Sequence, residues 1–343
     1  MTIKEIADKT NLSVATVSRV INNSKAVKQE TRERVLQLLE ENKNNYKYYA
    51  SNTHKTIALI LPDIHNPFYG EIIRGITRNA HAAAYDVLLF DTRDDSADEL
   101  AYLEKAVSQK VDGIILMSSS RGDRDERLTA FLSKAKIPIV LIDKEIRGMT
   151  LDGVFLDDMT GMVLLTETLV SCGHRKIALI AGEKDSSVTK KRVSGFRNAL
   201  QEFGLDSLPE QIIFASYTDT DIAVPVLSEL LSGSRRPTAI ITCNGLLTMT
   251  AIKCIRKQGL AIGRNISLVS FDEVPTLQLL GIDITSAYID LGEMGRTGFE
   301  LLLKKIEDPH SSRQKLIMVP AILKRGSELL SQEKPSVPAS PQR

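Results

Sequence analysis

Six Asp and Asn side chains follow closely on apolar runs of the sequence, a position where polar residues often bind a ligand. They are Asp63, Asn66, Asp91, Asp143, Asn244 and Asp272. Carboxylates accept hydrogen bonds and amides both donate and accept them, so such a set suits a molecule with many hydroxyl groups. An Asp or Asn at the end of a strand is also commonly an Asx turn or the N-cap of the next helix. Both interpretations stay open for each position.

Motifs typical of catalysis or metal binding are absent from the sequence. There is no Gly-x-Ser-x-Gly elbow, no phosphate-binding P-loop and no i,i+4 pair among the five histidines. The three cysteines, Cys172, Cys243 and Cys254, are odd in number and lack metal-ligand spacing, as is typical of a reducing compartment. We therefore expect a protein that is not an enzyme and that has no metal and no cofactor.

Alternating apolar runs and amphipathic segments surround these polar residues. The runs are "TIALILP", "DVLLFDT", "GIILM", "IPIVLID", "KIALIAG", "TAIITCN" and "SLVSFDE". Strands that are apolar on both faces and alternate with helices predict parallel sheets of βαβ units. Two such series predict an α/β core of two similar lobes, with ligands at the carboxyl ends of the strands.

The first 46 residues have a different pattern, that of three short helices. Thr2 and Glu5 form a potential capping box, Ser13 is placed to cap a second helix, and "KQETRERVLQLLEEN" predicts a third. Only "NLS" separates the first two helices, which is the size of a helix-turn-helix unit.

The second of these helices, "SVATVSRVIN" at residues 13–22, has two distinct faces. At about 100° per residue, one face carries apolar side chains for packing. The opposite face carries Ala15, Ser18, Arg19 and Asn22, with Val14 at its border. Such groups can bind phosphate oxygens, a guanine or a thymine methyl. A solvated amphipathic helix is the alternative that spacing alone leaves open.

Specific motifs indicate a family. "TIKEIADKTNLSVATVSRVINN" followed by "VKQETRERV" resembles the DNA-binding headpiece of the lactose/galactose repressor (LacI/GalR) family of bacterial transcriptional regulators. The resemblance implies that Val14, Ala15 and Arg19 read bases. It also implies that a second group of residues holds the phosphate backbone: Thr2, Ser13, Thr16, Ser18, Asn22 and Thr31.

The rest of the chain resembles the effector-binding core of the same repressors, which is similar to periplasmic sugar-binding proteins. The motifs are "DIHNPFYGEIIRGI", "IPIVLID", "GHRKIALIAG", "RVSGF" and "ISLVSFDE". The resemblance implies an effector site in which four side chains bond the effector: Asp143, Arg192, Asn244 and Asp272. Phe68 and Tyr217 are candidate walls of this site, and Asn66 is a further candidate. One departure is Asn244-Gly245, where the family usually has Asn-Asp.

The junction between the two parts also departs from the family. These repressors usually continue with a pattern like Tyr-x-Pro-Asn-x-x-Ala-x-x-Leu, a hinge helix whose leucine wedges into the minor groove. This chain has "NNYKYYASNTHKT", which lacks the proline and the leucine and is rich in residues that compete with helix formation. We expect a shortened, poorly helical linker.

These observations predict an α/β protein with an N-terminal all-α helix-turn-helix headpiece followed by a two-lobed, periplasmic-binding-protein-like core with parallel sheets. The expected parts are a DNA-binding domain at 1–46, a shortened hinge at 47–56, an effector-binding and dimerisation domain at 57–328 and a disordered tail at 329–343. The tail "SQEKPSVPASPQR" has no heptad pattern, so we expect a homodimer.

Composition is consistent with a DNA-binding role. The first 49 residues carry nine Lys and Arg against six Asp and Glu. No stretch approaches the roughly 20 apolar residues that span a bilayer, and no secretion signal is recognised, so we expect a cytoplasmic protein without a membrane partner. The expected function is repression from pseudo-palindromic operator DNA, modulated by a carbohydrate effector. The alternative is a solute-binding protein with a vestigial headpiece.

Overall fold

The computed structural model describes residues 3–21, 27–41, 55–120, 122–234 and 236–330. Thr2, Asn22, nearly all of the expected linker and the end of the tail therefore lie outside the described residues. The chain divides into two compact units, Met1–Lys55 and Thr56–Arg343, and each is described by itself.

The N-terminal unit contains three helices around a small apolar core. They are α1 (Ile3–Thr10), α2 (Val14–Ile21) and α3 (Gln29–Glu41). The buried side chains of this core come from all three helices: Ile6, Ala7, Val17, Val20 and Val35. Asn11 has a φ of 53° in the short turn between α1 and α2, a conformation that Asn tolerates better than most residues. The predicted three-helix arrangement is therefore confirmed.

The first lobe of the second unit, called the N-lobe here, has a six-stranded sheet in the order β11-β5-β4-β3-β1-β2. Its strands are β1 (Lys55–Leu61), β2 (Tyr85–Asp91), β3 (Gly113–Leu116), β4 (Ile139–Asp143), β5 (Asp152–Leu156) and β11 (Lys315–Met318). Its helices are α5 (Pro67–Ala82), α6 (Ser96–Ser108), α7 (Glu126–Lys134) and α13 (Leu291–Glu307), with the 3-10 turn η1 (Gly122–Arg124). Side chains of α6 and α7 pack on one face of the sheet, and those of α5 and α13 on the other.

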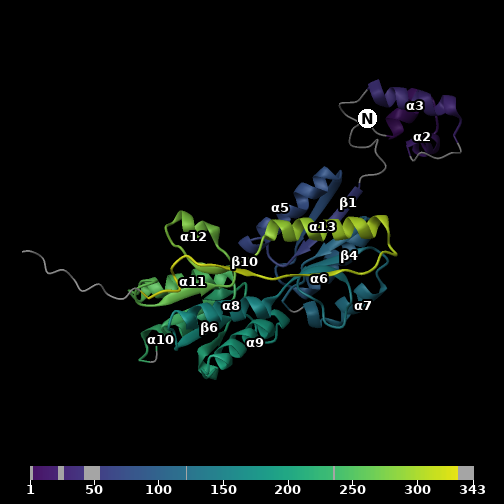
Figure 1. Cartoon of the computed structure of the whole chain (residues 1–343). Helices are drawn as coiled ribbons and strands as arrows, with labels where there is room; N and C mark the ends of the chain where they lie inside the picture. The colour runs from purple at the N-terminus through teal and green to yellow at the C-terminus, as the bar shows by residue number, and fades with distance from the viewer. Residues whose placement is uncertain (1–2, 22–26, 42–54, 121, 235, 331–343) are drawn as a thin grey trace, which may run out of the picture. The chain divides into compact units, whose positions relative to one another are not determined.

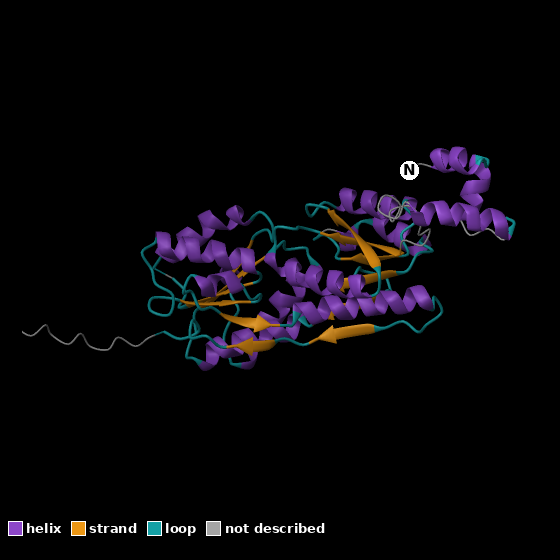
Figure 2. Ribbon diagram, turned by 90° about the horizontal axis from the view of Figure 1, so that it is seen from above, coloured by secondary structure: helices purple, strands orange, loops and turns teal. Residues whose placement is uncertain are grey.

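The second lobe, called the C-lobe, repeats this arrangement with the strand order β12-β10-β9-β8-β6-β7. Its strands are β6 (Ile177–Ala181), β7 (Ile212–Phe214), β8 (Ala239–Thr242), β9 (Ser267–Ser270), β10 (Thr285–Tyr288) and β12 (Ala321–Leu323). Its helices are α8 (Asp158–Ser171), α9 (Ser187–Glu202), α10 (Ala223–Ser232), α11 (Gly245–Lys257) and α12 (Pro275–Leu279), with the 3-10 turns η2 (Pro209–Gln211) and η3 (Thr220–Ile222). Figure 2 shows the strands of each sheet flanked by helices.

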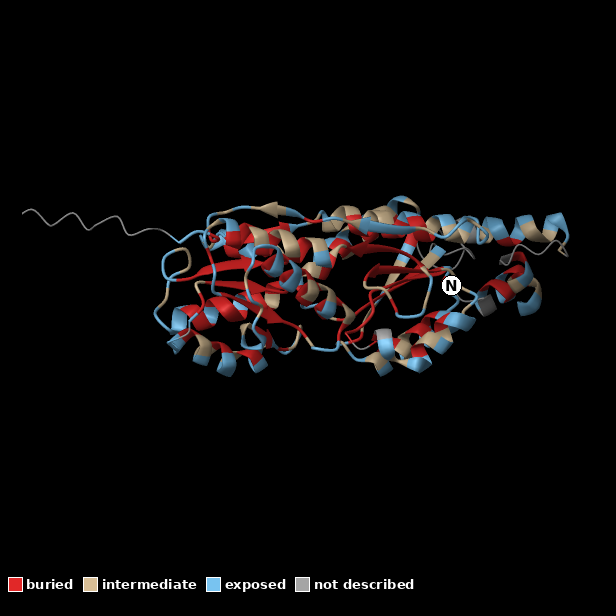
Figure 3. Ribbon diagram, turned by 60° about the horizontal axis from the view of Figure 1, so that its bottom comes forward, coloured by how far each residue is buried: buried red, intermediate tan, exposed pale blue. Residues whose placement is uncertain are grey.

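The chain passes between the lobes three times, which ties them into one body. It crosses from β5 to α8, returns from β10 to α13, and crosses again from β11 to β12. β12 runs antiparallel to β10, whereas the other strand pairs with a described register are parallel. In Figure 3 the strands are mostly buried and the outer faces of the helices are exposed.

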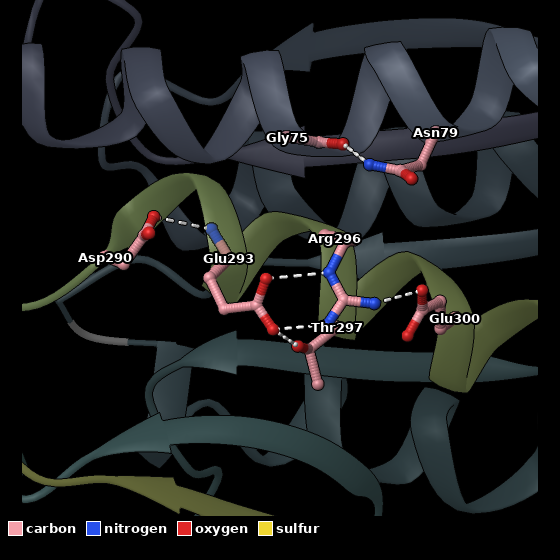
Figure 4. Close-up of polar contacts among 7 residues, drawn as sticks. All are labelled: Gly75, Asn79, Asp290, Glu293, Arg296, Thr297 and Glu300. Carbon is pink, nitrogen blue, oxygen red and sulfur yellow. Dashed lines mark hydrogen bonds and ion pairs between the residues drawn. The ribbon is translucent and has the colours of Figure 1, made fainter.

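In the N-lobe, α5 and α13 cross at very close range (Figures 1 and 4). A Cβ added at Gly75 would lie 2.2 Å from the Gly292 carbonyl oxygen, and one added at Gly295 would lie 2.2 Å from the Ile72 carbonyl oxygen. Only glycine permits this approach of two backbones. Arg296 pairs with Glu293 and Glu300 on the same helix (Figure 4). The crossing joins α5 to the helix that follows the second passage between the lobes.

The apolar runs of the sequence form the strands that they predict. Each of the seven runs contains a strand, and together they form β1, β2, β3, β4, β6, β8 and β9. The sequence prediction omitted β5, β7, β10, β11 and β12. β5 is fully buried but starts with Asp-Gly, a turn signal, and β11 is largely exposed at a sheet edge. Both features conceal a strand from a search for long apolar runs.

Candidate functional site

The helix α2 has the two faces that its sequence predicts. Val17 and Val20 are buried in the core of the N-terminal unit. On the other side Val14 is 51% exposed, and Ala15 and Arg19 are exposed as well. Arg19 forms no hydrogen bond or ion pair within the described residues of the unit. An arginine with no partner among the described residues therefore lies beside small apolar groups on an exposed helix face.

Hydroxyl groups fix the start of this helix. The Ser13 side chain accepts a hydrogen bond from the Thr16 amide at 3.1 Å, and the two hydroxyl oxygens lie 2.8 Å apart. Ser13 therefore caps α2 as predicted. Ser18 is half-buried on α2, and Thr31 is half-buried in the first turn of α3. Thr2 and Asn22, the other two predicted phosphate contacts, lie outside the described residues.

A small cavity between the two lobes brings together all seven side chains predicted to form an effector site. Its lining consists of Asn66, Phe68, Tyr69, Asp143, Lys144, Val188, Arg192, Tyr217, Asn244 and Asp272. The cavity has a volume of about 40 Å³. Side chains of both lobes therefore meet around one small cavity.

The N-lobe contributes the start of α5 and the end of β4. Asn66 is the N-cap of α5 and accepts a hydrogen bond from the Phe68 amide at 3.1 Å. The rings of Phe68 and Tyr69 meet edge to face with centroids 5.2 Å apart. Asp143 is 7% exposed and has a φ of 75°, a strained conformation for a residue with a side chain. Its carboxylate forms no hydrogen bond within the described residues, so it can accept from a ligand.

The C-lobe contributes Arg192, whose guanidinium is held by several groups. Its Nε donates to the Asp158 carboxylate at 2.8 Å, and Nη1 donates to the Cys243 carbonyl oxygen. The guanidinium carbon lies 3.7 Å from the ring centroid of Phe271, a cation–π contact. Asp158 is 2% exposed, so this is a buried ion pair. Arg192 is thus part of the C-lobe framework as well as of the cavity wall.

Asn244 and Asp272 are held by the first turn of α11. Asn244 is the N-cap, accepting from the Leu247 amide at 2.8 Å and donating to the Tyr217 carbonyl oxygen at 3.0 Å. The amide of Gly245 donates to Asp272 at 3.1 Å. A Cβ added at Gly245 would lie 2.9 Å from a methyl carbon of Val274. Val274 thus occupies the space that a side chain at this departure from the family pattern would need.

Burial dominates the electrostatics of the site. It raises the pKa of Asp143 to about 6, with Lys144 opposing the shift. Burial also raises the pKa values of Asp158 and Asp272, although the Arg192 charge acts against both shifts. Burial opposes the charge on Arg192, but Asp158 keeps its pKa above the ordinary value. The cavity therefore favours hydrogen-bonding groups over additional negative charge.

Two of the six Asp and Asn residues first singled out from the sequence have local roles instead. Asp63 accepts from the His65 amide at 2.9 Å, and Asp91 accepts from the Arg93 amide at 3.1 Å. Both are Asx turns, and neither lines the cavity. Sequence analysis also missed Tyr69 and Asp158. Tyr69 directly follows Phe68, while Asp158 follows β5, the strand that the sequence prediction omitted.

The described residues contain no group of three or more His, Cys, Asp or Glu side chains arranged to hold a metal ion. None of the helices in this part of the chain combines the length and apolar character that a membrane span requires. Cys172, Cys243 and Cys254 are free thiols.

Two family descriptions match the chain over nearly its full length. Residues 2–47 match "Bacterial regulatory proteins, lacI family", and residues 54–325 match "Periplasmic binding proteins and sugar binding domain of LacI family". The first match contains α1, α2 and α3, and the second contains both lobes.

Curated proteins and a solved structure agree with these matches. The ribose operon repressor of Haemophilus influenzae is 29% identical over 331 residues, covering 95% of this chain and 98% of the relative. The HTH-type transcriptional repressor PurR of Aliivibrio fischeri is 30% identical over 337 residues, with 96% and 98% coverage. A structure of the transcriptional regulator CelR with cellobiose has a TM-score of 0.72 and 25% identity, covering 95% of this chain and 99% of that chain.

Proposed function

The chain belongs to the LacI family of bacterial regulatory proteins, a family of DNA-binding regulators with an effector-binding domain, and from this premise we propose a specific function. The protein represses transcription by binding a pseudo-palindromic operator as a homodimer. A small neutral carbohydrate between the lobes changes its affinity for that operator.

The exposed face of α2 is the observation that supports DNA reading most directly. In the proposal, Arg19 bonds a guanine in the major groove and Val14 and Ala15 contact base edges. Ser13, Thr16, Ser18 and Thr31, with Thr2 and Asn22, hold the phosphate backbone. The Ser13 cap fixes the start of α2, and burial of Val17 and Val20 fixes its orientation in the N-terminal unit. The face with Val14, Ala15 and Arg19 is therefore exposed.

The two-fold symmetry of a homodimer matches a pseudo-palindromic operator. Leu279 and Leu280 are 85% and 72% exposed, the highest values among the large apolar side chains of the described residues. Contact between two copies would remove this apolar surface from water. In this proposal, Leu279→Asp/Leu280→Asp shifts the protein toward the monomer in sedimentation velocity measurements. An unchanged dimer would exclude this surface from the interface.

A carbohydrate suits the polar lining of the cavity. Asp143 has a carboxylate without a partner among the described residues, and Asn66 and Asp272 present further acceptors. Sugar hydroxyls donate to such acceptors and also accept from donors. The site residues proposed are Asn66, Phe68, Asp143, Arg192, Tyr217, Asn244 and Asp272. The relatives include a ribose operon repressor and a regulator in complex with cellobiose, which supports this ligand class.

Because the cavity is lined by side chains of both lobes, a ligand that binds there contacts the two lobes at once. The three passages between the lobes are the natural place for a hinge motion. Effector binding then shifts the population between open and closed lobes. This role needs no catalytic step, and we propose that the protein works without enzymatic activity in the cytoplasm, where its DNA target is.

The DNA-binding part of the proposal is tested with an electrophoretic mobility shift on the DNA upstream of the protein's own gene. We expect a shifted complex that requires a pseudo-palindrome of about 14 to 20 base pairs, with one recognition helix bound to each half-site. A protein that binds carbohydrate but shifts no DNA would instead be a solute-binding protein with a vestigial headpiece.

The effector part is tested by a thermal-shift screen of neutral carbohydrates followed by calorimetry. Removing a buried charged hydrogen-bond partner costs about 2–5 kcal/mol, so Asp272→Asn should weaken binding of the best compound strongly and leave DNA binding intact. Arg264→Gln, an exposed change in the same lobe, is the matched control. Unchanged affinity in Asp272→Asn would remove Asp272 from the site.

A further inference from the structure

A second, larger groove lies between the lobes and is not used by the proposed function. It has a volume of about 370 Å³. Its lining consists of Arg124, Glu145, Ile146, Arg147, Gly148, Met149, Asp185, Ser187, Lys190 and Lys191. The groove adjoins the effector cavity along two segments of chain, because Lys144 and Val188 line the cavity while Glu145 and Ser187 line the groove.

The groove contains more positive than negative charge. Its two carboxylates are already paired: Asp185 lies 3.5 Å from Arg124, and Glu145 lies 3.3 Å from Lys191. Glu145 also pairs with Lys315 at 2.8 Å. The Arg124–Asp185 and Lys191–Glu145 pairs join the two lobes, whereas the Lys315–Glu145 pair lies within the N-lobe.

Two further cations line the groove and take no part in these pairs. Arg147 from the N-lobe and Lys190 from the C-lobe are exposed, and neither has a hydrogen bond or ion pair within the described residues. Because Glu145 and Asp185 are already paired with other cations, these two side chains leave the groove with a net positive charge. A bound anion would offset this charge and bridge the lobes.

The start of α9 adds to the positive potential. This helix of 16 residues begins at Ser187, which lines the groove. Its N-cap residue Ser186 makes no side-chain hydrogen bond to the first turn. The free amide groups and the helix dipole at such an end favour an anion.

We propose that this groove binds a phosphate-type anionic group of a small molecule, between Arg147 and Lys190. The size and concave shape of the groove fit a small anion better than a nucleic-acid backbone, which requires an extended surface. The site is separate from DNA reading and from the neutral-carbohydrate site. The phosphate belongs either to an effector that reaches out of the cavity or to a second molecule.

Inorganic pyrophosphate is titrated into the full chain at constant ionic strength. Calorimetry and thermal shift measure its binding. We expect saturable binding and a higher melting temperature. Arg147→Gln/Lys190→Gln should weaken pyrophosphate binding by about tenfold or more, since it removes two charge-assisted contacts. The control Arg78→Gln/Arg264→Gln also removes one exposed positive charge from each lobe, but both positions lie outside the groove, so it should bind pyrophosphate like the original protein.

Three outcomes would overturn the proposal. They are no saturable binding of pyrophosphate, equal weakening in both double variants, and unchanged affinity in Arg147→Gln/Lys190→Gln. Circular dichroism of each variant verifies that it is folded.

Two comparisons then identify the source of the phosphate. If one ligand spans both sites, ribose 5-phosphate binds more tightly than ribose or pyrophosphate alone, and both Asp272→Asn and the groove variant weaken it. If the groove takes a second molecule, pyrophosphate binds equally well with and without a neutral sugar. Because pyrophosphate does not use Asp272, its binding to Asp272→Asn tests the groove even if the carbohydrate proposal fails.

Discussion

Arg19 and Arg192 show how differently the two proposed binding surfaces are built. Arg19 lies exposed on α2 and has no partner within the described residues. Arg192 is 4% exposed, pairs with Asp158 and packs on Phe271. On α2 a side chain can change without disturbing its neighbours, whereas in the cavity a change to one side chain leaves others without partners. Substitutions on the exposed face of α2 should therefore change DNA binding without changing stability. Substitutions in the cavity should change effector binding and stability together.

The largest expected effect is on stability, from Arg192→Ala. Removing one partner of a buried ion pair leaves an uncompensated charge, so we expect the free energy of unfolding to fall by about 3–5 kcal/mol. Urea denaturation measures it. The double change Arg192→Ala/Asp158→Asn should recover part of the loss, because it removes the unpaired carboxylate charge. The control is Arg78→Ala, which removes an exposed arginine. If Arg192→Ala is no less stable than this control, Arg192 does not stabilise the fold and the proposed difference between the two binding surfaces is wrong.

The pH dependence of stability should reveal Asp143. Burial raises its pKa from 3.8 to about 6, so the folded state binds a proton more tightly than the unfolded state. This contribution is fully present below about pH 4 and is lost as the pH rises through about 6. Its upper size is about 3 kcal/mol for a shift of roughly two units.

The matched variant for this measurement is Asp143→Asn, because Asn tolerates the φ of 75° at this position. Between pH 4 and 7 the original protein should lose more unfolding free energy than the variant. Asp158 and Asp272 have pKa shifts of the same sign, so part of the slope should persist in the variant. Parallel profiles for the two proteins would show that Asp143 does not titrate as described.

Arg19→Ala should have a smaller effect, confined to DNA. Loss of a bidentate contact with guanine costs about 1–3 kcal/mol of binding and relaxes the preference at one base pair in each half-site. The free energy of unfolding should change by no more than about 0.5 kcal/mol, since the side chain is exposed. A base-substitution scan and urea denaturation measure the two quantities. Equal loss at every base position would show that Arg19 contacts the backbone instead.

The sequence predicted both surfaces, but for different reasons. On α2, the helical period alone separates the packed Val17 and Val20 from the exposed Val14 and Arg19. Local geometry fixes such a face, so the pattern is sufficient. The cavity residues come from helices, strand ends and loops of both lobes, and only the resemblance to a family brought Phe68, Arg192 and Tyr217 into the set. No spacing rule links positions so far apart in the chain.

What the sequence missed depends on tertiary structure. Asp158 became visible as the partner of Arg192 only once β5 and α8 were placed. β11 and β12 are edge strands whose positions are set by the last passage between the lobes, and their own residues carry little strand signal. Asp63 and Asp91 had the same sequence context as Asp143, and only three-dimensional structure separated Asx turns from a cavity wall.

The smallest expected effect is the communication between the two surfaces. The residues that would carry it, "NNYKYYASNTHKT" at 44–56, lie almost entirely outside the described residues, so the prediction rests on their sequence. They lack the proline and the leucine of the family pattern, and Asn, Ser and Thr compete with helix formation through their own hydrogen bonds. Without a hinge helix to wedge into the minor groove, operator bending and the extra contacts that it permits should be weak. Effector binding should then change operator affinity by less than about fivefold, which is a coupling below about 1 kcal/mol. Operator titrations with and without effector, together with a circular-permutation bending assay, measure both quantities. A strong kink at the operator centre or a coupling of about 3 kcal/mol would show that this linker forms an ordered hinge on DNA despite its composition.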